Sequence, residues 1–291
     1  MSSVHYGGQA VIEGVMMRGT HNVAIAIRKP SGEIVVHGEP LPARIYNSRW
    51  AKLPFLRGLT GLWDTLVLGI RALMYSADMA LEEEDVKFGG AAMWGTMAMS
   101  LLIGVGLFVL TPMLLVGLVD RLIPSHLLSN LAEGLVRLLF FVSYLLIVGR
   151  LSDIQRVFSY HGAEHKTINA YENGVPLTPT EVQRFGTAHA RCGTSFLLIV
   201  LLLFVLLTSF LGRPSLLVRF ASRLLLLPVV SAIAYEFIRF SANHPDNVLV
   251  RALVAPGMWL QRLTTREPED SMLEVSIAAL QRVLADDGLS T

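Results

Sequence analysis

Long runs of apolar residues dominate the middle of the chain, between residues 93 and 240. A helix needs about 20 apolar residues to cross the hydrocarbon core of a bilayer. Pro112 interrupts the first run and predicts a kink there. The pattern therefore predicts an α-helical polytopic membrane protein with about four transmembrane helices, at about residues 93–119, 134–150, 194–211 and 216–240.

The first 50 residues have a different pattern, in which apolar and polar positions alternate. Residues 23–29 and 33–37 alternate on either side of the turn-forming sequence Pro30-Ser31-Gly32. Alternation with a period of two on both sides of a turn is typical of a β-hairpin. We therefore expect a small soluble β element over residues 1–50.

The start of this element, Gly7–Gly19, is unusually rich in glycine and carries the charged residues Glu13 and Arg18. Glycine permits close approach of the backbone and positive φ angles. The segment is compatible with a third, bulged strand. It is equally compatible with a loop that returns to a functional site elsewhere in the chain.

Residues 51–92 have apolar side chains at helical spacing with charged residues between them. This pattern predicts an amphipathic helix. Its aromatic residues suit a membrane interface, while its apolar face would also suit packing on the β element. The sequence leaves both arrangements open.

Positive charge predicts the orientation of the chain. Nine Lys or Arg residues precede Met93. Others are concentrated in residues 150–193, which we expect to form a polar loop between the second and third spans, and in the tail, 241–291. Four spans would place these segments on one side of the membrane, which the positive-inside rule assigns to the cytoplasm. We therefore expect both termini and a polar face in the cytoplasm, with an amphipathic helix at about 270–284 in the tail.

Composition agrees with a membrane protein. Of the 291 residues, 53% are hydrophobic and 16% are charged, against roughly 25% charged in soluble domains. The net charge of +1 gives no electrostatic case for a nucleic-acid partner. Cys192 is the single cysteine, so no intrachain disulfide can form. The first residues have no apolar core of a signal peptide, so the first span is expected to direct insertion.

The sequence Tyr160-His161-Gly162-Ala163-Glu164-His165 contains an H-x-x-E-H motif. On a helix, His161 and His165 lie one turn apart on the same face. Two imidazoles at this spacing can hold one metal ion, and a neighbouring carboxylate can accept a proton from water. Asn169 and Glu172 continue the same face, either as supporting groups or as solvated residues.

Further candidate ligands follow the motif. His189, Arg191 and Cys192 lie close together before the third run, and Glu236 is a carboxylate near the end of the fourth. Imidazole, thiolate and carboxylate are all zinc ligands. Less specific roles are open as well. The two motif histidines could form hydrogen bonds at the interface, Cys192 could be a small buried residue, and Glu236 could pair with Arg239 or another arginine.

The sequence resembles the YqhQ-like family of bacterial membrane proteins. Members of this family contain a domain of unknown function and are described as predicted metal-dependent enzymes. The matching blocks are Gly7–Gly19 (GGQAVIEGVMMRG), Pro54–Gly58 (PFLRG), Asp153–Glu172 (DIQRVFSYHGAEHKTINAYE), Arg191–Phe196 (RCGTSF) and Pro256–Pro268 (PGMWLQRLTTREP). One departure is Ala190, where the family is expected to have proline. The resemblance implies metal dependence, a bacterial inner-membrane location, and a functional unit shared by the N-terminal block and residues 150–193.

The leading hypothesis is a metal-dependent membrane enzyme, in the first place a zinc hydrolase acting at the cytoplasmic interface. His161 and His165 would be ligands, with His189, Cys192 or Glu236 completing the site and Glu164 acting as general base. Glu13, Arg18 and Arg191 are further site candidates. The expected partners are the bilayer and a membrane-protein or lipid-linked substrate, and a homo-oligomer is compatible. The alternatives are a scaffold, assembly or regulatory protein with a structural metal site, and a small transporter or channel.

Overall fold

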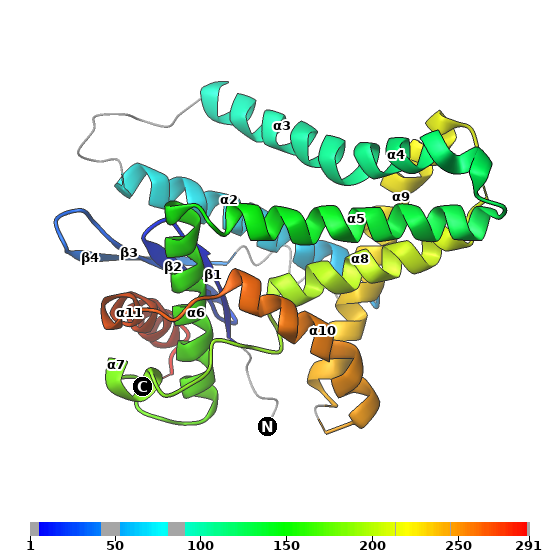
Figure 1. Ribbon diagram of the computed structural model, residues 1–291. Helices are drawn as coiled ribbons and strands as arrows, with labels where there is room; N and C mark the ends of the chain where they lie inside the picture. The colour runs from blue at the N-terminus through cyan, green and yellow to red at the C-terminus, as the bar shows by residue number, and fades with distance from the viewer. Residues whose placement is uncertain (1–5, 42–52, 81–90, 213, 245, 290–291) are drawn as a thin grey trace.

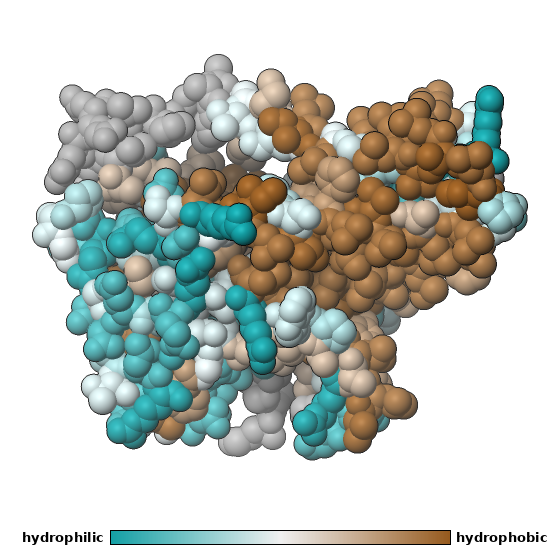
Figure 2. Space-filling model, in the orientation of Figure 1, coloured by the Kyte–Doolittle hydropathy of each residue, from teal (hydrophilic) through white to brown (hydrophobic). Residues whose placement is uncertain are grey.

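The computed structural model describes residues 6–41, 53–80, 91–212, 214–244 and 246–289. Residues 81–90 of the expected helical segment and 42–50 of the expected β element lie outside the described residues. Figure 1 shows a small sheet flanked by helices at one end of the molecule and a set of long helices extending from it. Hydrophilic residues gather over the first part and hydrophobic residues over the second (Figure 2). We call the first part, described at residues 6–41, 53–80, 152–192 and 265–289, the polar unit. We call the second part, which contains the described residues within 91–151 and 193–264, the apolar unit.

The polar unit is built on a four-stranded antiparallel sheet in the order β1-β2-β3-β4. The strands are β1 (Gly7–Val11), β2 (Gly14–Arg18), β3 (Asn22–Arg28) and β4 (Ile34–Pro40). The expected hairpin is confirmed as β3-β4. The glycine-rich segment forms a second hairpin rather than a single bulged strand, because Glu13 adopts a φ of +53° in the tight turn between β1 and β2.

Both faces of the sheet are covered, which explains why its central strands are almost continuously apolar. Alternate residues of β2 and β3 point to opposite sides. Val15, Met17, Ala24 and Ala26 belong to the core under the helices α6 (Ser152–Glu172) and α11 (Asp270–Asp286). Met16, Val23, Ile25 and Ile27 belong to the core under α2 (Leu56–Ala80). Figure 1 shows the resulting three layers.

The helix α2 packs on the sheet and also exposes apolar side chains. Leu68 and Ala72 are buried in the core between α2 and the sheet. Trp63, Leu66 and Leu73 are exposed on the helix. Packing on the β element, one of the two arrangements that the sequence left open, is therefore confirmed. The exposed aromatic and aliphatic side chains of α2 would also suit the other arrangement, contact with a membrane interface.

The C-terminal segment is an integral layer of the polar unit rather than a peripheral tail. The predicted amphipathic helix at 270–284 is α11, whose apolar face is buried against the sheet and α6. Just after it, the Asp287 carboxylate accepts hydrogen bonds from the backbone N–H groups of Thr20 and His21 and from the Asn22 side chain. These bonds fix the end of α11 to the loop between β2 and β3 and to the start of β3.

Among the residues that the structure describes, three helical stretches are long and apolar enough to cross a membrane, namely Trp94–Leu122, His126–Val148 and Leu216–Ala242. The first consists of α3 (Ala91–Val105), a π-helical turn η3 (Gly106–Leu110), α4 (Thr111–Val119) and a 3₁₀ turn η4 (Asp120–Leu122). The other two are α5 (His126–Val148) and α9 (Leu216–Ala242). The π-helical turn lies immediately before Pro112, where the sequence predicts a kink.

Two details differ from the predicted spans. The helix α8 (Gly193–Ser209) corresponds to the third predicted span but has only 17 residues, which is shorter than one full crossing. The helix α5 begins at His126 rather than near residue 134, because the Ser125 side chain accepts the N–H of Leu128 and caps an earlier start. The charged residues Glu133 and Arg137 do not interrupt it, since both are buried and paired.

Residues 150–193 are not the loop that their polarity predicts. They contain the long helix α6 and the short helix α7 (Pro179–Val182). The tail also contains a helix that the sequence analysis missed, α10 (Val248–Thr264), which has Pro256 in its interior. This helix lies against α8 and leads into the turn that precedes α11.

We expect Asp287→Ala to lower the free energy of unfolding of the polar unit by about 1–3 kcal/mol, because it removes charge-assisted hydrogen bonds. Partial burial acts to raise the pKa of Asp287, but its hydrogen bonds outweigh burial and hold the pKa below the usual value. The stabilisation is therefore complete at neutral pH and is lost as the pH falls below about 4. Thermal or denaturant unfolding of the purified protein at pH 7 and at lower pH measures both effects.

Asp286→Ala is the matched control. Asp286 forms an exposed pair with Arg282 one turn away, and such pairs contribute about 0–1 kcal/mol. Equal destabilisation by the two variants would contradict the role given to Asp287.

Candidate metal centre

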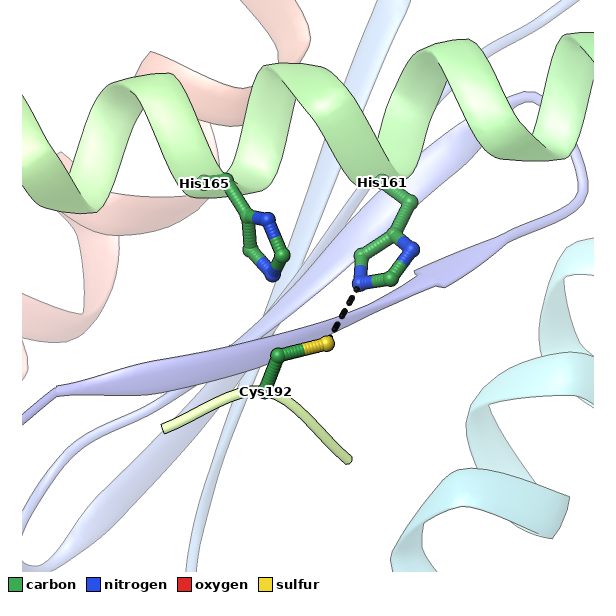
Figure 3. Close-up of side chains that lie close together, drawn as sticks. All are labelled: His161, His165 and Cys192. Atoms are coloured by element: carbon green, nitrogen blue, oxygen red, sulfur yellow. Dashed lines mark hydrogen bonds between the residues drawn. The ribbon is translucent and has the colours of Figure 1, made fainter. Parts of the chain in front are cut away.

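The H-x-x-E-H motif lies on α6, as its spacing requires. His161 and His165 project from the same face of the helix, with ring centroids 4.4 Å apart (Figure 3). His165 and Glu164 are almost completely buried, and His161 is partly exposed. The face opposite the two imidazoles contributes to the core of the polar unit, where Ala163 and Ala170 are buried. Burial of α6 therefore fixes the direction in which the histidines point.

The third member of the cluster, Cys192, comes from the segment that leads into α8. Its Sγ lies 3.3 Å from His161 Nε2 and also accepts the backbone N–H of Thr194, so Cys192 is the N-cap of α8. Figure 3 shows the thiol pointing at the two imidazoles. One ligand atom from each of His161, His165 and Cys192 lies within 4.8 Å of the others.

Backbone carbonyls set the tautomers of both histidines. His161 Nδ1 lies 2.8 Å from the Thr264 carbonyl oxygen, and His165 Nδ1 lies 2.6 Å from that of Thr187. A carbonyl oxygen can only accept, so each Nδ1 carries the proton and donates it. Each neutral ring then has its free lone pair on Nε2, which is the arrangement found in metal-ligating histidines whose other nitrogen is held by a carbonyl.

This donor set fits zinc. Zinc in proteins is held by imidazole nitrogen and thiolate sulfur at about 2.0 and 2.3 Å, in tetrahedral geometry. Tetrahedral geometry at these bond lengths places ligand atoms roughly 3.3–3.7 Å apart, so only small rotations separate the present positions from ligation. Three protein ligands leave one position open, as in catalytic rather than structural zinc sites.

Glu164 lies beside this set without belonging to it. Its Oε2 is 3.4 Å from His165 Nε2. The strand β1 covers the same carboxylate, since a Cβ atom added to Gly8 would come within 2.8 Å of Glu164 Cγ and 2.6 Å of the Met16 carbonyl oxygen. The glycine-rich N-terminus therefore does return to the candidate site, as one of the two predicted arrangements requires.

His189 is close to the cluster but engaged elsewhere. Its ring centroid lies 5.7 Å from that of His165, while its Nε2 lies 3.4 Å from a carboxylate oxygen of Glu172. Arg191 pairs with the other oxygen of the same carboxylate. Although partial burial opposes ionisation, the bonds from His189 and Arg191 lower the pKa of Glu172 to about 2. Glu172 is thus an anion that supports the loop before Cys192.

Several residues that position the site were missed by the sequence analysis. The fully buried Gln261 of α10 pairs its amide with the backbone N–H and carbonyl of His189, at 2.9 and 2.8 Å. Thr187 and Thr264, whose carbonyls hold the imidazoles, were missed as well. Asn169, by contrast, was a candidate supporting group, and it donates to the carbonyls of Gly186 and Ala188 in the same loop. Only the block Pro256–Pro268 of the family resemblance pointed towards Gln261, and it gave no role to the residue.

The remaining candidates lie away from the metal cluster. Glu13 forms an ion pair with Arg156 on α6, and Arg18 pairs with Asp64 at 3.0 Å, which joins β2 to α2. Glu236 pairs with Arg57 at the start of α2. The ion-pair alternative for Glu236 is therefore the arrangement observed, with Arg57 in place of Arg239.

Comparison with known proteins places this chain in a family. Residues 53–286, which include α6 and Cys192, match the family described as "Protein of unknown function (DUF1385)". The chain belongs to the DUF1385 family. It is 34% identical over 298 aligned residues to "Uncharacterized protein YqhQ" of Bacillus subtilis (strain 168), which covers 98% of this chain and 94% of the relative. The resemblance to YqhQ-like proteins is thereby confirmed.

No solved structure matches the chain. The description of the DUF1385 family assigns no reaction to its members. Any chemistry has to be argued from the residues of the site itself.

We expect the purified protein to bind one equivalent of Zn²⁺, and His161→Ala, His165→Ala and Cys192→Ala each to weaken zinc binding by at least about 100-fold. Loss of a group that only orients a ligand already costs roughly 10–100-fold, and a lost ligand costs more. Competition with a chromogenic zinc chelator measures the affinities.

His189→Ala and Glu236→Ala are the controls, because these residues bind Glu172 and Arg57 instead. Both variants should change zinc affinity by less than about tenfold. A loss in either control as large as that in the three ligand variants would show that the ligand set is wrong.

Proposed function

We propose that this DUF1385 protein is a metal-dependent integral membrane enzyme, a hydrolase that acts at the cytoplasmic face of a bacterial inner membrane. The observation that carries this proposal is the preset geometry of His161, His165 and Cys192 with a buried carboxylate beside them. Both imidazoles are held in the ligating tautomer, and three protein donors leave one position for a substrate or water.

A zinc ion at this site would supply Lewis acidity towards a carbonyl or phosphoryl group. Zinc is favoured over magnesium or calcium because the donors are nitrogen and sulfur rather than oxygen. Cys192, His161 and His165 would hold the ion, while Thr187 and Thr264 keep the imidazoles oriented through their carbonyls.

In this proposal Glu164 is the catalytic residue. Its carboxylate accepts a proton from water while the water oxygen forms a bond to the carbonyl carbon or phosphorus of the substrate. The bond to the leaving group then breaks, and Glu164 returns the proton to that group. Gly8 of β1 lies against the Glu164 side chain, which is almost completely buried, and this supports its separation from bulk water.

The substrate class follows from the surroundings of the cluster. Cys192 stands at the start of an apolar helix, and the partly exposed His161 is the open side of the site. Exposed apolar residues on α2 and α10, among them Trp63 and Trp259, suit an interface with lipid. We therefore propose a membrane-protein or lipid-linked substrate with a hydrolysable carbonyl or phosphoryl group.

A structural metal site in a scaffold, assembly or regulatory protein is the second candidate. The observation that favours it is the burial of His165 and Cys192, which are 1% and 5% exposed. A small transporter or channel has less support. Ionisable residues in or near a span would be its signal, but Arg219 and Arg223 pair with Glu133, and Glu236 pairs with Arg57.

Glu164→Gln should leave zinc affinity within about threefold of the parent value and reduce hydrolysis by roughly 10²–10⁴-fold, the range for loss of a general base. The protein is reconstituted with zinc in liposomes of total bacterial lipid extract, and mass spectrometry follows the disappearance of substrates and appearance of products. Glu267→Gln is a control, since Glu267 is a mostly exposed partner of Lys166.

Two results would count against the enzyme proposal. One is an unchanged product pattern in Glu164→Gln at full zinc occupancy. The other is a large fall in thermal stability on removal of zinc by a chelator from a protein that converts no lipid or membrane peptide. That second result would favour the structural site, because structural zinc contributes directly to folding.

A further inference from the structure

The apolar unit encloses a second cluster of charged side chains, at the end of α5 and α8 remote from the metal centre. Glu133 on α5 is 1% exposed and pairs with Arg137 one turn further along, at 2.8 Å. It also pairs with Arg219 and Arg223 of α9, at 2.7 and 3.3 Å. We call these residues, together with Asp120, the arginine cluster. Charged residues inside apolar spans are costly and mark functional sites by default.

The charges of the arginine cluster do not balance. Three guanidinium groups, each at most 5% exposed, face the carboxylates of Glu133 and Asp120, the latter 3.6 Å from Arg219. Arginine stays protonated in proteins. One positive charge is therefore left without a counter-charge among the residues that the structure describes, in surroundings where water cannot screen it.

Two arginines of the cluster have a buried nitrogen without a hydrogen-bond partner among the described residues, Arg219 at Nε and Arg137 at Nη1, and of the two Arg137 lines a cavity. Its Nη2 binds Glu133, and its Nε donates to the carbonyl of Phe108 at 2.8 Å. That carbonyl is available because Pro112, four residues on, has no N–H to give it. The guanidinium lies over the Phe204 ring at 4.7 Å, and its buried Nη1 has no hydrogen-bond partner within the described part of the chain.

A cavity adjoins this guanidinium. It has a volume of about 180 Å³ and lies between η3, α5, α8 and α9. Of the described residues that line it, Arg137 alone is charged, and the rest are apolar, including Phe108, Phe141 and Phe204. Apolar cavities of comparable volume bind hydrocarbon groups about the size of benzene. The wall of the cavity is thus almost entirely apolar, and the buried, incompletely paired guanidinium lies just behind it, where a turn of the Arg137 side chain would bring its nitrogens to the cavity.

We propose that this cavity binds a single-chain anionic amphiphile, a fatty-acid carboxylate in chemical class, with part of its hydrocarbon against the phenylalanines and its carboxylate on Arg137. The anion supplies the missing counter-charge, and carboxylate is the natural bidentate partner of a guanidinium. The limited volume favours one chain over two. This site is separate from the metal centre and does not depend on the proposed hydrolysis.

The test uses the purified full-length protein in dodecyl maltoside and cis-parinaric acid, whose fluorescence rises in apolar surroundings. We expect saturable binding at one site per chain, with displacement by oleate and not by inorganic phosphate. The methyl ester of the same probe should bind at least about tenfold more weakly, because a charged hydrogen bond is lost.

The informative variant is Arg137→Gln. It leaves two guanidiniums facing two carboxylates, so the cluster becomes balanced and the fold is expected to persist. Its affinity for the acid should fall about tenfold to hundredfold and match that for the ester. Arg137→Lys should restore the preference for the acid. Val200→Phe fills the cavity and should abolish binding of both probes, while Arg121→Gln, outside the cluster, should change neither.

Size-exclusion profile and thermal midpoint confirm that each variant is folded. Equal affinity of the parent protein for acid and ester, or undiminished acid binding by Arg137→Gln, would overturn the role of the charge. Unchanged binding by Val200→Phe would place the probe outside the cavity. Displacement by phosphatidylglycerol but not by oleate would reject a single-chain ligand.

Discussion

The close approach between α6 and the chain segment after α10 is the constraint on which the rest of the candidate metal centre depends. A Cβ atom at Gly162 would lie 2.0 Å from the Arg266 carbonyl oxygen, so only glycine lets the two backbones meet. The approach brings the Thr264 carbonyl to His161, and the Arg266 N–H bonds to the Phe158 carbonyl on α6. The absence of a side chain at Gly162 therefore permits both the contact that sets the tautomer of His161 and the covering of this face of α6.

The polar unit explains how segments far apart in the sequence form one site. The sheet is buried on both faces, and α11 closes one of them through contacts with strands that precede it by some 250 residues. The same packing places Gly8 of β1 against Glu164. The N-terminal block, α6 and the C-terminal helix therefore cannot fold as independent modules, because each supplies part of a core that the others need.

Much of this arrangement could be predicted from local pattern. The spacing of His161 and His165 predicts their common face, and the alternation of residues 23–37 predicts the β3-β4 hairpin. Local pattern could not give Thr187, Thr264 or Gln261 a role, since these common residues act through the backbone or the amide of a segment distant in sequence. It also could not decide between the two roles it left open for Glu236, metal ligand or ion-pair partner, because the partner Arg57 lies on α2, far away in the sequence.

Cys192 makes two contacts at once. Its sulfur lies against His161 Nε2, and the same sulfur accepts the N–H of Thr194 as the N-cap of α8. One residue of an α-helix corresponds to about 1.5 Å along its axis. A displacement of α8 by a single residue would therefore carry the sulfur well out of its contact with His161. An ion held by the cluster would therefore be linked to the axial position of α8, so that a force displacing this helix would also change the affinity for the ion.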